Sequence, residues 1–179
     1  LVPAASELSA IGDQARLNAM HLRGTKYVVS LSAPIVAYII AMAPAIMAFW
    51  ITLDDYTYSV LALRMLAFGY FFSSLTGVVN SIGRGLGALN YEMLASLFIA
   101  ITNLTLSITF ILIWGFMGAL LSTTMTLIMG HTLLLYRFNQ YIGTSFRKLL
   151  IGAFMRPLIL SLSAGIVTWL AFYLSFGPP

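Results

Sequence analysis

Residues 93–136 read MLASLFIAITNLTLSITFILIWGFMGALLSTTMTLIMGHTLLLY, a run of 44 positions without lysine, arginine, aspartate or glutamate. A helix needs about 20 mainly apolar residues to cross the roughly 30 Å hydrocarbon core of a bilayer. The run is therefore too long for one crossing and has the right length for two. Trp114-Gly115 is the natural break, which predicts membrane-spanning helices over residues 91–113 and 116–135.

The composition of the whole chain agrees with this interpretation. Its 179 residues are 60% hydrophobic and 8% charged, whereas soluble domains carry about 25% charged residues. Inside a bilayer the backbone must satisfy its own hydrogen bonds, so long apolar runs become helices. The runs are too long and too uniformly apolar for the alternating strands, roughly ten residues each, of an outer-membrane barrel. The sequence predicts an all-α, polytopic transmembrane helix bundle.

Three further apolar runs bring the predicted number of spans to about five. Asp13 is expected to cap the helix that leads into the first span. That span contains Pro34 and Pro44, and a proline inside a helix removes a hydrogen bond and kinks the helix. In chain order, the predicted spans cover residues 27–53, 59–82, 91–113, 116–135 and 157–179.

The segments between the spans carry most of the charge. Residues 1–26 form an amphipathic, basic segment, residues 83–90 a glycine-rich turn and residues 137–156 a basic linker, all expected in the cytoplasm. Asp54-Asp55 forms a short acidic loop on the other side. Both ends of the chain resemble cuts through a longer protein, so we expect a fragment.

The positions of the basic residues test this layout, because successive loops alternate between the two sides of the membrane. Eight of the nine basic residues fall on one side, which the positive-inside rule assigns to the cytoplasm. A wrong helix count would scramble this pattern. The protein is therefore predicted to be a multi-pass protein of the cytoplasmic membrane. The eight residues are Arg16, Arg23, Lys26, Arg84, Arg137, Arg147, Lys148 and Arg156.

Arg64 is the one charged residue inside a predicted span. Charges within the membrane are costly and are functional candidates, so Arg64 is a candidate for contact with an anionic substrate in a cavity. The alternative is that it snorkels, since it lies only about one and a half turns from the external end of its helix. The second interpretation is favoured, because Arg64 falls on roughly the opposite face from the polar residues of the same helix.

Those polar residues form a stripe in the second span. Ser73, Thr76 and Asn80 recur at helical spacing together with Gly69 and Gly77. The stripe is a candidate for lining an aqueous substrate path. It is equally a candidate for helix–helix contact, which small and hydroxyl side chains favour in membranes.

A second stripe consists of small residues in the fourth span. Gly118, Ser122, Thr126 and Gly130 repeat every four residues, a pattern that lets another helix approach closely. We interpret it as a packing surface. Asn103, in the third span, is a further candidate for the substrate path, although a hydrogen bond across helices is the preferred interpretation.

Motifs of enzymes and metal sites are missing from the sequence. The chain has no cysteine, so it has no disulfide and no thiolate metal site. The five acidic residues lie away from the span centres and form no zinc-protease motif. Gly83-x-Gly85-x-Gly87 does not match the dinucleotide-binding pattern and follows no strand. We expect no enzymatic activity, no catalytic residue, no metal, no cofactor and no nucleic-acid partner.

Two groups of residues resemble a known family. Pro3-Ala4-Ala5-Ser6-Glu7-Leu8 followed by Gly12-Asp13 is similar to a P-x-x-S-x-L…G-D segment in flippases of the multidrug/oligosaccharidyl-lipid/polysaccharide (MOP) exporter superfamily, where it follows the eighth helix. Pro34 matches a proline common in the next helix. The stretch from Asn103-Leu104 through Gly115-Phe116-Met117-Gly118-Ala119 resembles the N-L…G-x-x-G-A pattern near the eleventh and twelfth helices.

The resemblance covers nearly the whole chain and is greatest to the polysaccharide/O-antigen branch. It implies that the chain is most of the C-terminal lobe of a transporter with two six-helix lobes around a central cavity. It also implies alternating access and the flipping of a polyprenyl-pyrophosphate-linked saccharide across the cytoplasmic membrane. The implied partners are that saccharide, membrane lipids and other polysaccharide assembly proteins.

Two alternatives remain open at this point. A cation-coupled drug or small-molecule exporter of the same superfamily would need an intramembrane carboxylate for coupling, and no predicted span of this chain has one near its centre. A non-transporter membrane subunit of polysaccharide synthesis would need catalytic acids at a membrane surface.

Overall fold

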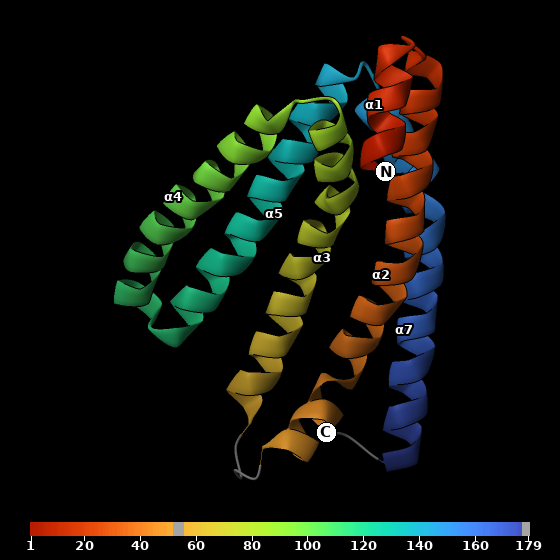
Figure 1. The fold of residues 1–179 in the computed structure, drawn as a ribbon. Coiled ribbons are helices and arrows are strands. Elements are labelled where there is room, and N and C mark those ends of the chain that lie inside the picture. The colour runs from red at the N-terminus through yellow and green to blue at the C-terminus, as the bar shows by residue number, and fades with distance from the viewer. Residues whose placement is uncertain (52–55, 177–179) are drawn as a thin grey trace.

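The computed structural model describes residues 1–51 and 56–176, which form helices joined by short turns (Figure 1). Five helical segments are long and apolar enough to cross a membrane, which confirms the predicted all-α bundle. The predicted acidic loop, Asp54-Asp55, lies outside the described residues. The helices are α1 (Val2–Ala10), α2 (Gln14–Trp50), α3 (Thr57–Gly85), α4 (Leu89–Trp114), α5 (Phe116–Tyr141), α6 (Phe146–Leu149), a π-helical stretch (Leu150–Phe154) and α7 (Met155–Phe176).

Asp13 begins α2, as the sequence predicts. Its Oδ1 accepts a hydrogen bond of 3.0 Å from the Arg16 backbone N–H, and its Oδ2 lies 3.1 Å from the Arg16 Nε. The helix then continues for 37 residues, a length of about 55 Å at 1.5 Å per residue. That length exceeds the hydrocarbon core, so the first turns of α2 extend beyond it. Residues 27–50 of the predicted span over 27–53 are thus part of one longer helix, which ends at Trp50.

Glycines with positive φ separate the helices. Gly115, with φ of 57° and ψ of −131°, ends α4 and begins α5 at the predicted break. Gly87, with φ of 70°, follows α3. There the Ala88 N–H donates to the Gly83 carbonyl at 2.8 Å, which closes a Schellman motif. The predicted turn over 83–90 is therefore shorter than expected, because Gly83 to Gly85 still belong to the last turn of α3.

The predicted basic linker, residues 137–156, is mostly helical. α5 continues to Tyr141, because Phe138 and Ile142 extend its buried face into the core. Helix resumes at Phe146 and passes through the π-helical stretch into α7. Only residues 142–145 separate the two helical segments, so the basic side chains of this region lie on helices.

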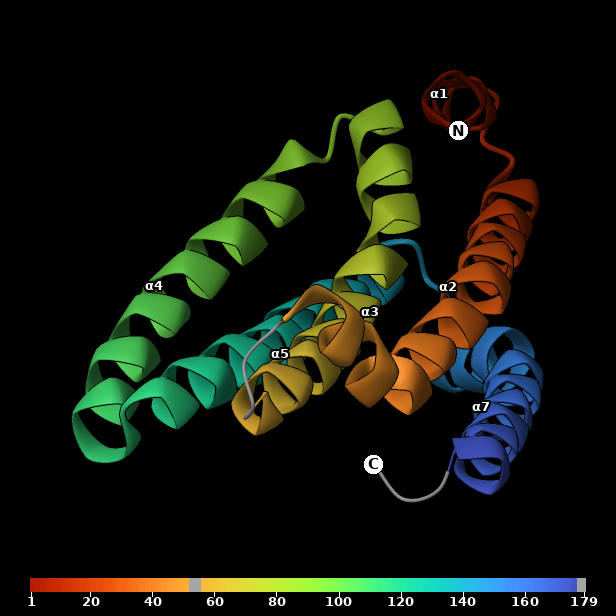
Figure 2. The same cartoon turned by 90° about the horizontal axis from the view of Figure 1, so that it is seen from below.

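The helices form an open layer rather than a closed bundle. The substantial contacts join α4 to α5, α5 to α3, α3 to α2, and α2 to α7, so α3 occupies the middle of the layer (Figure 2). The α4–α5 pair diverges from α2 and α7 toward the end of the molecule away from α1 (Figure 1). The main apolar core lies at the α1 end, where α1, α2, α3, α5 and the π-helical stretch meet.

The same end of the molecule carries the basic segments. The start of α2, the end of α3, the end of α5 and the start of α7 all lie near α1 (Figure 1). Together with the short helix α6, these segments hold the eight basic residues predicted to share one side of the membrane. Arg64 is separate from them, near the other end of α3.

The small-residue stripe of α5 packs against α4. A side chain at Gly118 would collide with the Phe110 backbone carbonyl, and one at Gly130 would collide with the Ile99 side chain. Between them, Ser122 is fully buried and its Oγ lies 2.9 Å from the Ser107 Oγ of α4. Close helix approach with an interhelical hydroxyl bond is the usual way in which membrane helices associate.

Replacement of Gly118 by alanine should destabilise this hairpin. The added methyl group would meet the Phe110 carbonyl, and such overpacking costs about 1–3 kcal/mol. The matched control is Gly77→Ala, because a side chain at Gly77 of α3 would meet nothing within 4 Å. That control should be neutral or stabilising by up to about 1 kcal/mol, since alanine favours helix. Unfolding in detergent at increasing SDS concentration measures the stability change of each variant. Equal effects of the two substitutions would contradict close packing of Gly118 against α4.

Candidate functional site

The polar stripe predicted on α3 lies against α5. Thr76 is 2% exposed. Its hydroxyl donates to the Ser73 carbonyl at 2.9 Å and lies 3.1 Å from the His131 Nδ1 of α5. Because the single hydroxyl proton goes to Ser73, the His131 Nδ1–H is the donor in the second bond. Thr76 is thus bonded within the interface between the two helices.

Asn80, like Ser73, is half-buried. Asn80 borders a void of about 10 Å³ between α3, α4 and α5, together with Tyr91 and Glu92. Its Oδ1 is buried and has no hydrogen-bond partner among the described residues. The void is about large enough for one water molecule, which could satisfy this oxygen. The structure therefore places Asn80 at a small internal space and not at a wide cavity.

A face of α3 adjacent to this stripe is open, and it includes Gly77, which the sequence pattern assigned to the stripe. Tyr70, Ser74, Gly77, Ser81 and Arg84 follow one another at spacings of three and four residues. Gly77 borders open space, and Tyr70 and Arg84 are exposed. The hydroxyls of Ser74 and Ser81 donate to carbonyls of their own helix at 2.7 and 2.8 Å. We call these five residues the open face of α3.

Sequence reasoning missed Ser74 and Ser81, although both show the helical spacing that identified the first stripe. Polar residues occur on adjacent faces of α3, and spacing alone does not reveal which face a neighbouring helix covers. Arg84, at the end of the open face, forms two hydrogen bonds to the Glu92 carboxylate, at 2.9 and 2.6 Å. This pair joins the end of α3 to the start of α4 and neutralises both charges.

Arg64 faces α2 instead of the polar stripe. Its Nε donates to the Ile40 carbonyl at 3.1 Å. Ile40 is the residue four positions before Pro44, and a proline has no N–H to donate to that carbonyl. Arg64 thus satisfies the backbone oxygen that Pro44 leaves free. It also borders a groove of about 370 Å³ between α2 and α7.

Asn103 belongs to the interface between α4 and α5. It is half-buried, and its Oδ1 accepts a long hydrogen bond of 3.4 Å from the Ser107 hydroxyl. Ser107 in turn meets Ser122 of α5. These contacts connect Asn103 to the packing of the hairpin, and its role in a substrate path stays a prediction.

A buried pair near the α1 end was not anticipated from the sequence. His21 of α2 is 0% exposed, and its Nε2 lies 2.8 Å from the Asn139 Oδ1 of α5. An amide oxygen only accepts, so the Nε2 carries the proton and donates. The ring also meets Phe138 edge-on, with centroids 5.7 Å apart. A lone histidine carries no signal for a partner 118 residues away.

Groups typical of catalytic and metal sites do not gather in residues 1–51 and 56–176. These residues hold no cluster of three histidine, cysteine or acidic side chains that could bind a metal ion. Their carboxylates are Glu7, Asp13 and Glu92, and the last two form ion pairs with arginines. The arrangement brings together hydroxyls, amides and imidazoles that hold helices to one another.

Comparisons with protein-family models, with curated proteins and with solved structures found no match to this chain. The resemblance of the sequence to the MOP superfamily therefore stays a prediction. The helices establish a multi-pass membrane protein in contact with membrane lipids.

The contact between Arg64 and Ile40 predicts a dependence on Pro44. Arg64→Met should destabilise the protein by about 1–2 kcal/mol, because it leaves the Ile40 carbonyl without a donor in an apolar environment. In a Pro44→Ala background the loss should be smaller by about 1 kcal/mol, since the new backbone N–H at position 44 donates to Ile40. A double-mutant cycle of unfolding free energies in detergent measures this coupling.

Arg23→Met is the matched control, because Arg23 is an exposed arginine of α2 far from Pro44 in the sequence. Its effect should be small and the same in both backgrounds. Equal losses for Arg64→Met with and without Pro44 would contradict the assigned role.

Proposed function

We propose that this chain forms most of one lobe of a two-lobe transporter that flips a lipid-linked oligosaccharide across the cytoplasmic membrane by alternating access. The observation that carries the proposal is the open face of α3. This helix lies in the middle of the layer, with α2 on one side and α5 on the other. The MOP resemblance of the sequence supports the same conclusion.

Small residues on the open face of α3 suit a protein or water neighbour better than lipid. Gly77 offers no side chain for packing against acyl chains, whereas Tyr70 and Arg84 place polar groups along the same line. Membrane helices place small and hydroxyl residues where another helix approaches. A second lobe facing α3 across a cavity would supply both a helix neighbour and water.

The packing of the layer also suits a lobe that moves as a unit. The apolar core and the His21–Asn139 bond join α2, α3 and α5 near α1. Toward the other end the α4–α5 pair diverges from α2 (Figure 1). In alternating access, lobes rock against each other around a central site, which requires firm contacts within each lobe.

Within this proposal the protein is a transporter and not an enzyme. Its partners are membrane lipids, a polyprenyl-pyrophosphate-linked saccharide and other polysaccharide assembly proteins. A cation-coupled exporter would need an intramembrane carboxylate free to bind the ion. Glu92 is the carboxylate on α4, and its ion pair with Arg84 near the helix start favours the flippase over the exporter.

Water should reach the open face of α3. The chain has no cysteine of its own, so Gly77→Cys introduces a single thiol. In native membranes this thiol should react with a membrane-impermeant methanethiosulfonate, because the open face lines an aqueous cavity. Leu97→Cys is the matched control, since Leu97 is exposed and lies eight residues from the start of α4 (97 − 89), just as Gly77 lies eight from the end of α3 (85 − 77).

The control thiol should stay unlabelled, because lipid excludes the charged reagent. Labelling of both positions, or of Leu97→Cys alone, would contradict a cavity at α3.

Loss of the protein should block export of a surface polysaccharide. A deletion strain should accumulate the lipid-linked repeat unit inside the cell, and the native gene should restore export. Gly77→Trp should fail to restore it, because the indole fills the open face, whereas Leu97→Trp, at an exposed position of α4, should succeed. Normal surface polysaccharide without accumulation of the lipid-linked unit would overturn the proposal.

A further inference from the structure

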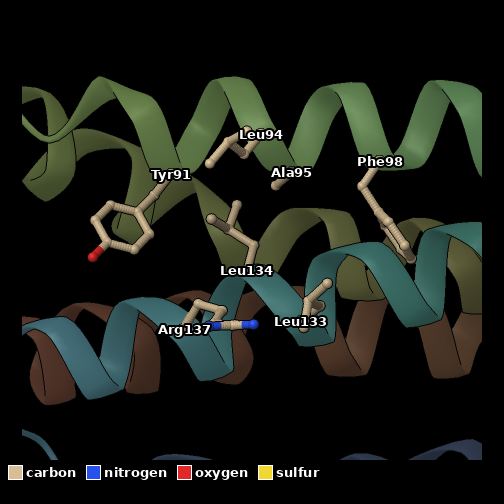
Figure 3. Close-up of a pocket in the computed structure, with 7 residues that line it drawn as sticks. All are labelled: Tyr91, Leu94, Ala95, Phe98, Leu133, Leu134 and Arg137. Atoms are coloured by element: carbon tan, nitrogen blue, oxygen red, sulfur yellow. The ribbon is translucent and has the colours of Figure 1, made fainter.

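A groove of about 280 Å³ runs between α4 and α5 near the basic end of the molecule (Figure 3). Its walls are apolar and consist of Leu94, Ala95 and Phe98 of α4 with Leu133 and Leu134 of α5. Leu94 is 60% exposed, so the groove opens at the surface of the hairpin. We call it the first groove. An apolar channel of this kind, open to the bilayer, suits an acyl chain.

One end of the first groove is polar. Tyr91 and Arg137 line the groove there, with the Tyr91 hydroxyl and the Arg137 guanidinium pointing in opposite directions (Figure 3). The Tyr91 ring packs on Tyr141 with centroids 5.1 Å apart, and Tyr141 follows Arg137 by four residues on the same face of α5. Two tyrosine rings and one cation therefore lie toward the basic end of the α4–α5 pair.

Arg137 differs from the arginines at the same end that have acidic partners. Arg16 pairs with Asp13, and Arg84 pairs with Glu92. Arg137 is exposed and forms no ion pair with any residue of 1–51 or 56–176. An exposed guanidinium at a membrane surface attracts anionic groups and can bind a phosphate through two parallel hydrogen bonds.

A second groove lies beside the first. It measures about 490 Å³ and shares Phe98 and Leu133 with the first groove. Tyr136 and Phe146 form its basic end, with ring centroids 5.8 Å apart, and Arg147 and Lys148 follow Phe146 directly. The two apolar grooves thus share Phe98 and Leu133, and Arg137 lines the first of them.

We propose that these paired grooves bind one anionic phospholipid of the cytoplasmic leaflet. The two acyl chains lie in the two grooves, on either side of Phe98 and Leu133. The phosphate binds the Arg137 guanidinium. Basic pockets between membrane helices on the cytoplasmic side recognise anionic headgroups in this way.

Charge favours a lipid over a protein as the occupant. An apolar helix from a second lobe or a second copy could fill the grooves, but it would leave Arg137 without a counter-charge. A phospholipid supplies two apolar chains and an anion in one molecule, which matches two grooves and a cation. This inference does not rest on the transport proposal, because it uses the groove between α4 and α5 and not the open face of α3.

Native mass spectrometry of the purified full chain in detergent tests the site. Phosphatidylglycerol and phosphatidylcholine with identical acyl chains are the probes. The anionic lipid should bind more tightly, and Arg137→Gln should reduce that preference about fivefold, the equivalent of about 1 kcal/mol per arginine at a membrane surface. Arg137→Lys should keep most of the preference. Arg23→Gln is the matched control, an exposed arginine of α2 at the same end.

The control change should leave the preference unaltered. Equal losses for Arg137→Gln and Arg23→Gln would show a general charge effect and overturn the site. A circular dichroism melt of each variant shows that the comparison is made on folded protein, and exposure of Arg137 makes its replacement compatible with folding.

A photoreactive lipid shows which residues the acyl chains of the bound lipid contact. Phosphatidylglycerol with a diazirine in one acyl chain should crosslink to Leu94, Phe98 and Leu133 in vesicles that contain the native protein. The Arg137→Gln variant should lose these crosslinks relative to those at other exposed residues of α4. Crosslinks spread evenly over the apolar surface would overturn the proposal.

Discussion

A bilayer supplies no water to satisfy backbone N–H and C=O groups, and the rest of this structure depends on that constraint. Five long helical segments satisfy nearly all of these groups internally. Glycine turns satisfy the helix ends, as in the Schellman motif around Gly87. Pro44 is the clearest break in the pattern, because it leaves the Ile40 carbonyl free in the middle of α2. The Arg64 Nε donates to that oxygen, so a charged side chain inside the apolar region serves the backbone of a neighbouring helix.

Side-chain hydroxyls obey the same constraint and thereby shape the layer. Ser74, Thr76 and Ser81 each donate to a carbonyl of α3 itself. Only Thr76 also reaches another helix, through His131. On α5, by contrast, small residues let α4 approach until Ser107 and Ser122 touch. One face of α3 is consequently bonded to α5 while another stays open, and that difference supports the proposed cavity of a two-lobe transporter.

A second constraint, the free-energy cost of moving a charged side chain out of water, determines where the charged residues lie. The basic residues gather where α2, α3, α5 and α7 meet the membrane surface, and Asp13 and Glu92 neutralise two of them. Arg137 lines an apolar groove between α4 and α5 and has no such partner among the described residues. The gathering of basic residues at one end also places a cation beside an apolar groove, which supports the proposed binding of an anionic lipid.

The sequence by itself determined the spans, the break at Gly115, the cap at Asp13 and the gathering of basic residues at one end, because each depends on local hydropathy, charge or φ. Only the tertiary structure decided which face of α3 is covered, that Thr76 meets His131, and that Arg64 meets Ile40. In a soluble protein, apolar periodicity would reveal the buried face. In a bilayer, lipid and neighbouring helices are equally apolar, so the same pattern is compatible with either face turned inward. Contacts between residues far apart in the chain resolve that ambiguity.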